Sequence, residues 1–130
     1  MKIQEALDGV DALKPNTCDE GTKIRWLSAL DARIHSEILM THDHDPAEEA
    51  FAGYTEQTDR DTELLAADPH DEMYLYYLES KIDYSNGEMG KYNNSAAMFN
   101  SAYAEYANFI NRTRTPVQKT DIRYFCGVRR

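Results

Sequence analysis

The chain has 130 residues with a formal charge of −9, and 42% of its residues are hydrophobic. A chain of this length is about the usual size of one domain and buries roughly two-thirds of its unfolded surface on folding. It has no apolar run long enough for a signal peptide or a membrane span, so we expect a protein that stays inside the cell that makes it. Cys18 and Cys126 lack a CxxC spacing, and we expect both thiols to be reduced.

The charge is unevenly distributed along the chain. Between residues 42 and 72 there are eleven carboxylates and a single base, Arg60, whereas residues 112 to 130 hold six bases and one acid, Asp121. An acidic surface repels the phosphate backbone of nucleic acids. The composition therefore argues against specific nucleic-acid binding by the body of the fold.

Two amphipathic helices are predicted at the start of the chain. Apolar residues recur at helical spacing over residues 2 to 14, and Pro15 prevents continuation of the helix. Thr17 and Glu20 have the spacing of a capping box, and the apolar spacing then continues to about Met40. The sequence thus predicts two helices joined by a short link.

Residues 41 to 69, the acidic loop, have a different character. They are polar and acidic, and Pro46 and Gly53 interrupt them. Their apolar residues form no sustained period, so we predict a long loop with one helical turn at residues 46 to 51, where proline favours the first helical position. Loops of this length in compact domains are usually functional or disordered.

A helical hairpin is predicted in the second half. Asp71 can cap a third helix that runs to about Ser85, and Asn86-Gly87 supplies residues that commonly end helices. Over residues 88 to 111, apolar residues step alternately by three and four, which predicts a fourth helix about 36 Å long with a heptad-like seam. The seam residues are Met89, Tyr92, Ala96, Phe99, Tyr103, Tyr106 and Ile110.

The helical pattern ends before residue 116. Residues 116 to 130 predict an extended basic tail, with a strand at residues 122 to 128 as one alternative. The predicted fold class is all-α, a small helical bundle with a long helical hairpin at its centre, the acidic loop and an extended C-terminal tail. Residues 1 to 115 form its single helical domain.

Few residues suggest catalysis or metal binding. The stretch of residues 42 to 45, HDHD, offers four metal-capable side chains, but positions i and i+2 converge on one ion only in an extended strand, so we expect a solvated loop. Asp31 and His35 are predicted to form an exposed pair on one helix. Carboxylate pairs such as Glu48-Glu49 lie among further acids, where we expect solvation rather than the raised pKa that acid/base catalysis needs. We therefore predict no catalytic, cofactor-binding or metal-binding residues, and no enzyme.

The nine tyrosines are more informative, because most of them lie in the predicted third and fourth helices. Tyrosine supplies a broad contact area with a polar tip, which suits protein interfaces, although the same residues can fill the core of one small bundle. The candidate interface residues are aromatic side chains of the loop and helices together with residues of the tail. They are Phe51, Tyr54, Tyr76, Tyr84, Tyr92, Arg123, Tyr124, Phe125, Arg129 and Arg130.

Four stretches between residue 2 and about residue 115 resemble one family. They are IQEALDGVDALKPNT, TKIRWLSALDARIHSEIL, LLAADPHDEMYLYYLESKIDYSNGE and KYNNSAAMFNSAYAEYANFINRT. Together they resemble small proteins of tailed phages and prophages of gut Firmicutes, in the family of helical head-to-tail connector, or adaptor, proteins. The resemblance is one of overall pattern, includes no catalytic signature and stops short of the basic tail.

The resemblance implies a structural virion protein that needs no cofactor and assembles as a ring of about twelve copies. Its implied partners are the portal protein above and a tail-completion, or stopper, protein below, first in the host cytoplasm and then at the head-tail junction of the virion. The acidic loop and residues 116 to 130 are the candidate partner contacts, because segments that order on docking commonly serve this purpose. The acidic middle and the basic tail of neighbouring copies are a further candidate contact, since a head-to-tail interface closes a ring.

Two other functions are compatible with the residues. One is a small phage regulatory protein that binds a host protein through the same tyrosine-rich face. The other is a metal-dependent helical enzyme that uses His35, His42 and His44.

Overall fold

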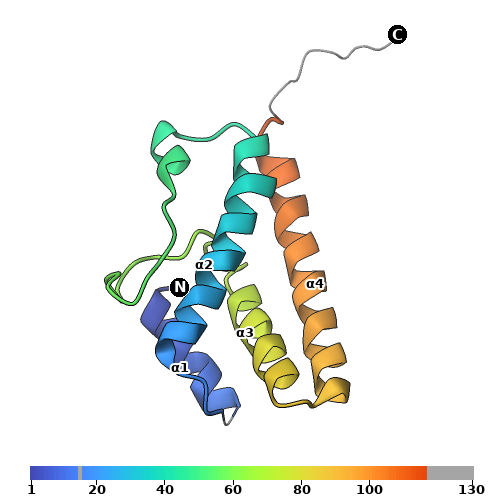
Figure 1. Cartoon of the computed structure of the whole chain (residues 1–130). Helices are drawn as coiled ribbons and strands as arrows, with labels where there is room; N and C mark the ends of the chain where they lie inside the picture. Colours follow the sequence, from blue (N-terminus) through green and yellow to red (C-terminus); the bar gives the residue numbers. More distant parts are fainter. Residues whose placement is uncertain (15, 117–130) are drawn as a thin grey trace.

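The structure is a computed structural model that describes residues 1–14 and 16–116. This part of the chain forms α1 (Ile3–Leu13), α2 (Glu20–Glu37), η1 (Leu39–Thr41), η2 (Pro46–Ala50), α3 (Glu72–Ser85) and α4 (Met89–Thr113), of which η1 and η2 are short 3-10 helices (Figure 1). Its residues include two isolated β-bridges but no strand, which confirms the predicted all-α class. The strand considered for residues 122 to 128 lies outside the described residues. None of the helices within residues 1–14 and 16–116 is both long and apolar enough to cross a bilayer.

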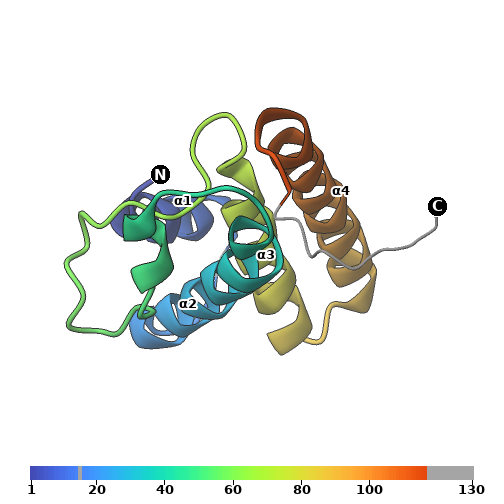
Figure 2. The same cartoon turned by 90° about the horizontal axis from the view of Figure 1, so that it is seen from above.

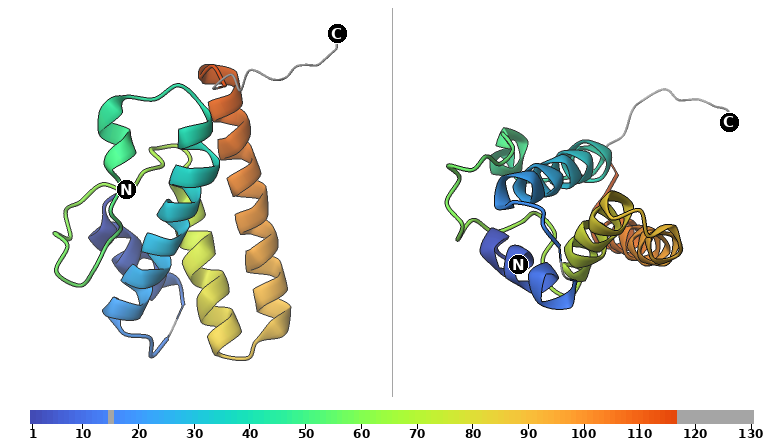
Figure 3. Two further views of the ribbon diagram at one scale, coloured as in Figure 1. Left: turned by 45° about the horizontal axis from the view of Figure 1, so that its top comes forward. Right: turned by 60° about the horizontal axis from the view of Figure 1, so that its bottom comes forward.

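Helix α3 occupies the centre of the bundle. It packs against α1 and α2 on one side and against α4 on the other (Figures 2 and 3). Helix α2 reaches α4 only toward the C-terminal end of α4, where the Tyr103 hydroxyl donates to Glu37 Oε1 at 2.9 Å and the Arg33 guanidinium lies 4.4 Å from the Tyr103 ring centroid. Helix α4 is therefore the edge helix of the bundle.

Helix α1 is held by its apolar face and by its backbone. Its buried residues, Ile3, Ala6, Leu7 and Val10, recur at the spacing that predicted the helix. The backbone N–H of Ile3 donates to the Thr62 carbonyl at 3.1 Å, so the first turn of α1 is anchored to the acidic loop. Such bonds satisfy amide groups that the start of a helix leaves without an intrahelical partner.

The cap of α2 differs from the sequence prediction. The N-cap is Asp19, whose carboxylate accepts the backbone N–H of Thr22 at 2.8 Å, so the predicted capping box of Thr17 and Glu20 is wrong. Asp19 has the correct spacing to the Thr22 amide, and its charge is favourable beside the positive end of the helix dipole. The chain then leaves α2 at Glu37 and continues through η1 to Thr41, close to the predicted end.

The acidic loop is part of the core, which its sequence did not predict. It folds over α1 and α2, and its side chains Tyr54, Leu64 and Ala66 are buried (Figure 1). Gly53 has a φ of 86°, and a Cβ at this position would lie 2.9 Å from Ser28 Oγ, so the sharp approach of the loop to α2 requires glycine. The predicted helical turn is confirmed as η2.

The predicted helical hairpin is confirmed, but only part of the predicted apolar seam of α4 is buried. Gly87 has a φ of 73° and ends α3, as the Asn86-Gly87 pair predicted. In α4, Phe99, Tyr106 and Ile110 are buried, whereas Met89 is 50% exposed. Among the described helices, α4 packs chiefly against α3, and its N-terminal part buries a narrower stripe.

Candidate protein-binding surface

An aromatic groove runs along one flank of the α3–α4 hairpin. Tyr77 and Tyr84 of α3 and Tyr92 and Phe99 of α4 line it, and its volume is about 420 Å³. The rings of Tyr84 and Tyr92 have centroids 5.5 Å apart, and those of Tyr77 and Phe99 are 5.0 Å apart. Tyr84 is 63% exposed, so the outer end of this row of rings is open to solvent and to a partner.

The opposite flank of the hairpin holds a second groove whose lining carries charges of both signs, the mixed-charge groove. It consists of two adjoining hollows of about 190 and 410 Å³ that share Tyr76 and Met98 as their apolar lining. Glu72 and Glu105 line one hollow, and Glu79 lines the other together with Lys14 and Lys91. Burial raises the pKa of the Glu79 carboxyl above its usual range, and the neighbouring Asp83 adds to this effect while Lys14 opposes it.

Between the two grooves, α4 exposes a face of small, uncharged residues. This outer face consists of Gly90, Asn93, Ala97, Asn100, Ala104 and Asn108, all of which are exposed. Only three of the 25 residues of α4 are charged, namely Lys91, Glu105 and Arg112. Depletion of charge is typical of the centres of protein interfaces, and small side chains allow close approach of a neighbouring surface.

The structure separates the predicted interface residues into three groups. Tyr84 is exposed, and Tyr76 and Tyr92 are half-buried at the grooves, so these three lie on the surface where a partner can reach them. Tyr54 is buried in the core and is not accessible to a partner, because its hydroxyl group bonds to α2. Phe51 is half-buried and stacks on His35 with ring centroids 5.6 Å apart.

The remaining predicted residues belong to the tail. Arg123, Tyr124, Phe125, Arg129 and Arg130 lie outside the described residues.

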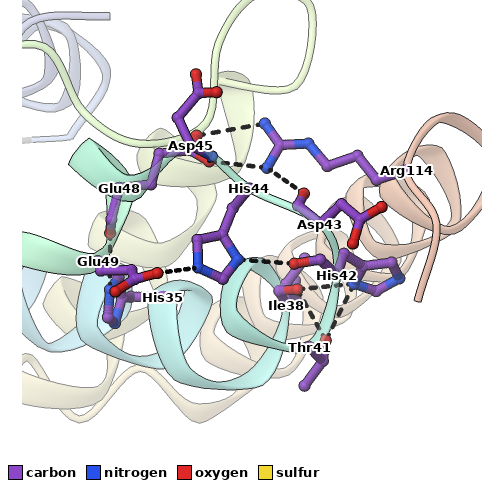
Figure 4. Close-up of polar contacts among 10 residues, drawn as sticks. All are labelled: His35, Ile38, Thr41, His42, Asp43, His44, Asp45, Glu48, Glu49 and Arg114. Carbon is purple, nitrogen blue, oxygen red and sulfur yellow. Dashed lines mark hydrogen bonds and ion pairs between the residues drawn. The ribbon is translucent and has the colours of Figure 1, made fainter. Parts of the chain in front are cut away.

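The three histidines proposed as metal ligands hold the acidic loop in place instead (Figure 4). His35 Nε2 donates to the Glu48 carbonyl at 2.9 Å, and His44 donates from Nδ1 to the His42 carbonyl at 2.8 Å and from Nε2 to Glu49 Oε2 at 3.1 Å. These two bonds and the nearby Glu48 raise the pKa of His44, with the bond to His42 the largest cause. Within residues 1–14 and 16–116, no three His, Cys, Asp or Glu side chains are grouped so that they can hold a metal ion.

His42 departs from the predicted solvated loop because it is buried. Its Nδ1 donates to the Ile38 carbonyl at 2.8 Å, and its Nε2 lies 2.7 Å from Asn111 Oδ1 on α4. Asp43 and Asp45 of the same stretch are exposed, as predicted. Within this stretch, His42 is therefore buried, whereas the carboxylates of Asp43 and Asp45 are exposed to solvent.

A charged contact joins the acidic loop to the end of α4. Arg114 donates from both terminal nitrogens to Glu48, at 3.1 and 3.3 Å, and this pairing lowers the pKa of the Glu48 carboxyl (Figure 4). The Asp43 backbone N–H donates to the Thr115 carbonyl at 2.8 Å. The chain therefore leaves α4 on the side of the bundle that faces α2 and the acidic loop.

Asp31 of α2 is a buried carboxylate that the sequence prediction missed. It is 0% exposed and makes no exposed pair with His35, so that prediction is wrong. Its Oδ2 accepts from the Tyr54 hydroxyl at 2.5 Å and the Leu65 N–H at 3.1 Å, and its Oδ1 accepts from the Tyr74 hydroxyl at 2.6 Å. Burial raises the pKa of Asp31, and these bonds oppose the rise. The sequence did contain a signal that Asp31 is buried, because residue 31 continues the apolar stripe of Ile24, Leu27, Ile34 and Ile38.

Asp83 of α3 is a second buried carboxylate and lies beneath the mixed-charge groove. It is 0% exposed, its Oδ2 accepts from the Ser95 hydroxyl at 2.8 Å, and its Oδ1 lies 3.1 Å from Lys14 Nζ. Among the described atoms, no donor meets Oδ1 with hydrogen-bond geometry, so the Lys14 contact is an ion pair without a directed bond. Lys14 and Ser95 both line the groove above it.

Comparison of the chain with models of known protein families, with curated proteins and with solved structures found no match.

Proposed function

We propose that this chain is a structural assembly protein, and specifically a head-to-tail connector that docks beneath a phage portal ring and joins it to the tail. The observation that carries the assembly role is the edge helix α4, which exposes an uncharged face between two grooves. Surfaces with such depletion of charge and exposed tyrosine and methionine side chains are suited to contact with other proteins. The connector assignment rests on the four sequence stretches that resemble that family.

The position of α4 is compatible with assembly into a ring. Ring closure needs a heterologous contact, in which one surface of a subunit meets a different surface of the next. The edge helix offers one such surface, and the acidic loop, on the far side of α1 and α2, offers another (Figure 3). A net-acidic subunit also gives a channel lining that does not retain DNA.

The direct test is to mix the purified chain with the portal protein of the phage that encodes it. We expect a complex of fixed stoichiometry by light scattering and a ring on a ring in negative-stain images of the same peak. Absence of association at both low and moderate salt would instead favour the alternative, a small regulatory protein that binds a host protein. Absence of the chain from purified virions would support that alternative independently.

Substitutions on α4 test whether its outer face takes part. Ala97→Arg and Ala104→Arg change exposed positions, so we expect the free energy of unfolding to stay within about 0.5 kcal/mol of the original. We expect each to weaken portal association or ring formation at least about tenfold, because a charge must be desolvated at the contact. Ala32→Arg on α2 is the matched control, since Ala32 is also an exposed helical alanine, and it should leave assembly unchanged.

A further inference from the structure

The aromatic groove lies on the flank of α4 from which the chain leaves this helix. Helices α2 and α4 lie side by side at their C-terminal ends and diverge toward the other end, with α3 between them (Figures 1 and 3). Tyr103 joins α4 to α2 through its bond to Glu37, and its ring centroid is 5.7 Å from that of Phe99, which lines the groove. The Thr115 carbonyl accepts the Asp43 N–H on the same side. The groove and the exit of the chain therefore share one flank.

The lining of the aromatic groove indicates the chemistry of its ligand. Four of its eight residues are aromatic, one is charged, Lys81, and none is a carboxylate. The ring of Tyr84 is 63% exposed, so it offers both its edge and its face. On the same flank, the Arg33 guanidinium lies over the Tyr103 ring at 4.4 Å from the centroid, which is a cation–π contact. The groove therefore suits aromatic side chains, with a guanidinium over an exposed ring.

The length of the chain beyond the described residues matches the position of the groove. Nine residues lead from residue 117 to Phe125, and they span roughly 30 Å when extended. Helix α4 ends at Thr113, and at about 1.5 Å per residue Phe99 lies about 21 Å and Tyr92 about 32 Å back along it. An extended chain that returns along α4 thus brings residues 124 and 125 to the groove.

We propose that residues 117 to 130 fold back along α4 and cover the aromatic groove of their own chain. Tyr124 and Phe125 pack on the rings of the groove, and Arg123 lies over the exposed ring of Tyr84. The groove is then closed in the free chain and opens when a partner draws this segment away. The contact itself is independent of the connector assignment, whereas its release by a partner rests on the proposed function.

Covalent connection favours the chain's own groove over that of a second copy. A segment on a short linker has an effective concentration in the millimolar range, whereas a second copy is present only at its bulk concentration. The segment also needs no turn around α4, because Thr115 is held on the flank that carries the groove. We therefore expect an intramolecular contact at micromolar protein concentration.

The native Cys126 allows a direct test, because it directly follows the aromatic pair. In a full-length chain with Cys18→Ser, Asn100→Cys places a thiol at the aromatic groove, and the matched control Asn94→Cys places one on the other flank of α4. Under mild oxidation at micromolar concentration, we expect Asn100→Cys to form an intrachain disulfide with Cys126, identified by peptide mass. It should form at least fivefold faster than with Asn94→Cys, after each thiol is normalised to its reaction with an external disulfide reagent.

The aromatic requirement is tested in the same assay. Tyr124→Ser with Phe125→Ser should lower the normalised rate for Asn100→Cys at least fivefold, and so should Tyr84→Ser, at an exposed position of the groove. Lys119→Gln, in the same segment but away from the aromatic pair, is the control and should change the rate by less than twofold. An unchanged rate in the Tyr124 and Phe125 variant would overturn the aromatic contact.

The same products decide between the groove, the chain and its copies. Equal or negligible intrachain rates for the two cysteine positions would overturn the groove as the binding site. A product of twice the mass in place of the intrachain disulfide would overturn the proposal in favour of a second copy.

The outcome can be separated from that of the proposed function. Portal association without the preferred disulfide at the aromatic groove would retain the connector assignment and discard this contact. The preferred disulfide without portal association would retain the contact and discard the connector assignment.

Discussion

At the scale of single residues, Asp31 joins three parts of the molecule. Its carboxylate belongs to α2, the Tyr74 hydroxyl to α3, and the Tyr54 hydroxyl and the Leu65 N–H to the acidic loop. The Tyr74 oxygen in turn accepts the Ala66 N–H at 2.8 Å. The loop is therefore attached to the bundle through one buried acceptor group, whose loss leaves several donors without partners.

We expect Asp31→Asn to lower the free energy of unfolding by about 2 kcal/mol, because the amide nitrogen faces a donor and one buried hydroxyl or N–H loses its acceptor. Denaturant unfolding followed by circular dichroism measures this change. Asp61→Asn, at an exposed position of the same loop, is the control and should change it by less than about 0.5 kcal/mol. Equal effects of the two substitutions would show that the Asp31 contacts do not stabilise the fold.

At the scale of elements, two glycines near the hairpin turn should respond in opposite directions to the same substitution. Gly87 has a φ of 73°, whereas Gly90 lies in the first turn of α4, and a Cβ at either position would meet nothing within 4 Å. Gly87→Ala should therefore lower the free energy of unfolding by about 1 kcal/mol through backbone strain alone. Gly90→Ala should raise the free energy of unfolding by about 0.5 kcal/mol, because alanine has the higher helix propensity. Thermal unfolding of the two variants checks both, and a stabilising Gly87→Ala would contradict the turn geometry.

The loop turn at η2 should depend on pH through His44. Its pKa is raised in the folded state, so the protonated ring stabilises the turn below the unfolded pKa of about 6.5, and this stabilisation is lost as the pH rises through the higher folded value. After correction for intrinsic rates, hydrogen exchange of the amides of residue 45 and residues 47 to 50 should be faster at pH 8 than at pH 6.

Because His35 and His42 contact the same loop, His44→Gln is the variant that isolates the effect. It should remove most of the pH dependence, while His35→Gln should retain it. Unchanged protection across this pH range in the original chain would exclude a role for the His44 charge.

The elements that sequence predicted well are those with local signals. The ends of α1 and α3 were predicted from a proline and from an Asn-Gly pair in the sequence, whose backbone restrictions act whatever the tertiary surroundings. The docking of the acidic loop was missed because it depends on partners distant in sequence, such as Ser28 for Tyr54. The two grooves were likewise not predictable, since they result from how α3 and α4 meet, although several of the tyrosines that line them were identified as candidates.

At the scale of the whole molecule, the bundle combines a well-packed side with an open one. Helices α1, α2 and α3 and the acidic loop cover one another, and α4 covers only α3 over much of its length (Figure 2). If the proposed assembly role is correct, stability and binding belong to different faces, and substitutions on the outer face of α4 should change assembly without changing folding.

The arrangement of contacts also has a consequence for the order in which the chain folds. Helices α3 and α4 are joined by a turn of three residues, so their contacts close a short loop, whereas the bond from the Ile3 N–H to Thr62 spans most of the first half of the chain. Closing a longer loop costs more entropy. We expect the transition state of folding to contain the helical hairpin before the loop docks. Stopped-flow Φ-values should accordingly be high for Phe99→Leu in the hairpin and near zero for Leu64→Ala in the loop, and the reverse order would show that nucleation begins at the opposite side of the bundle.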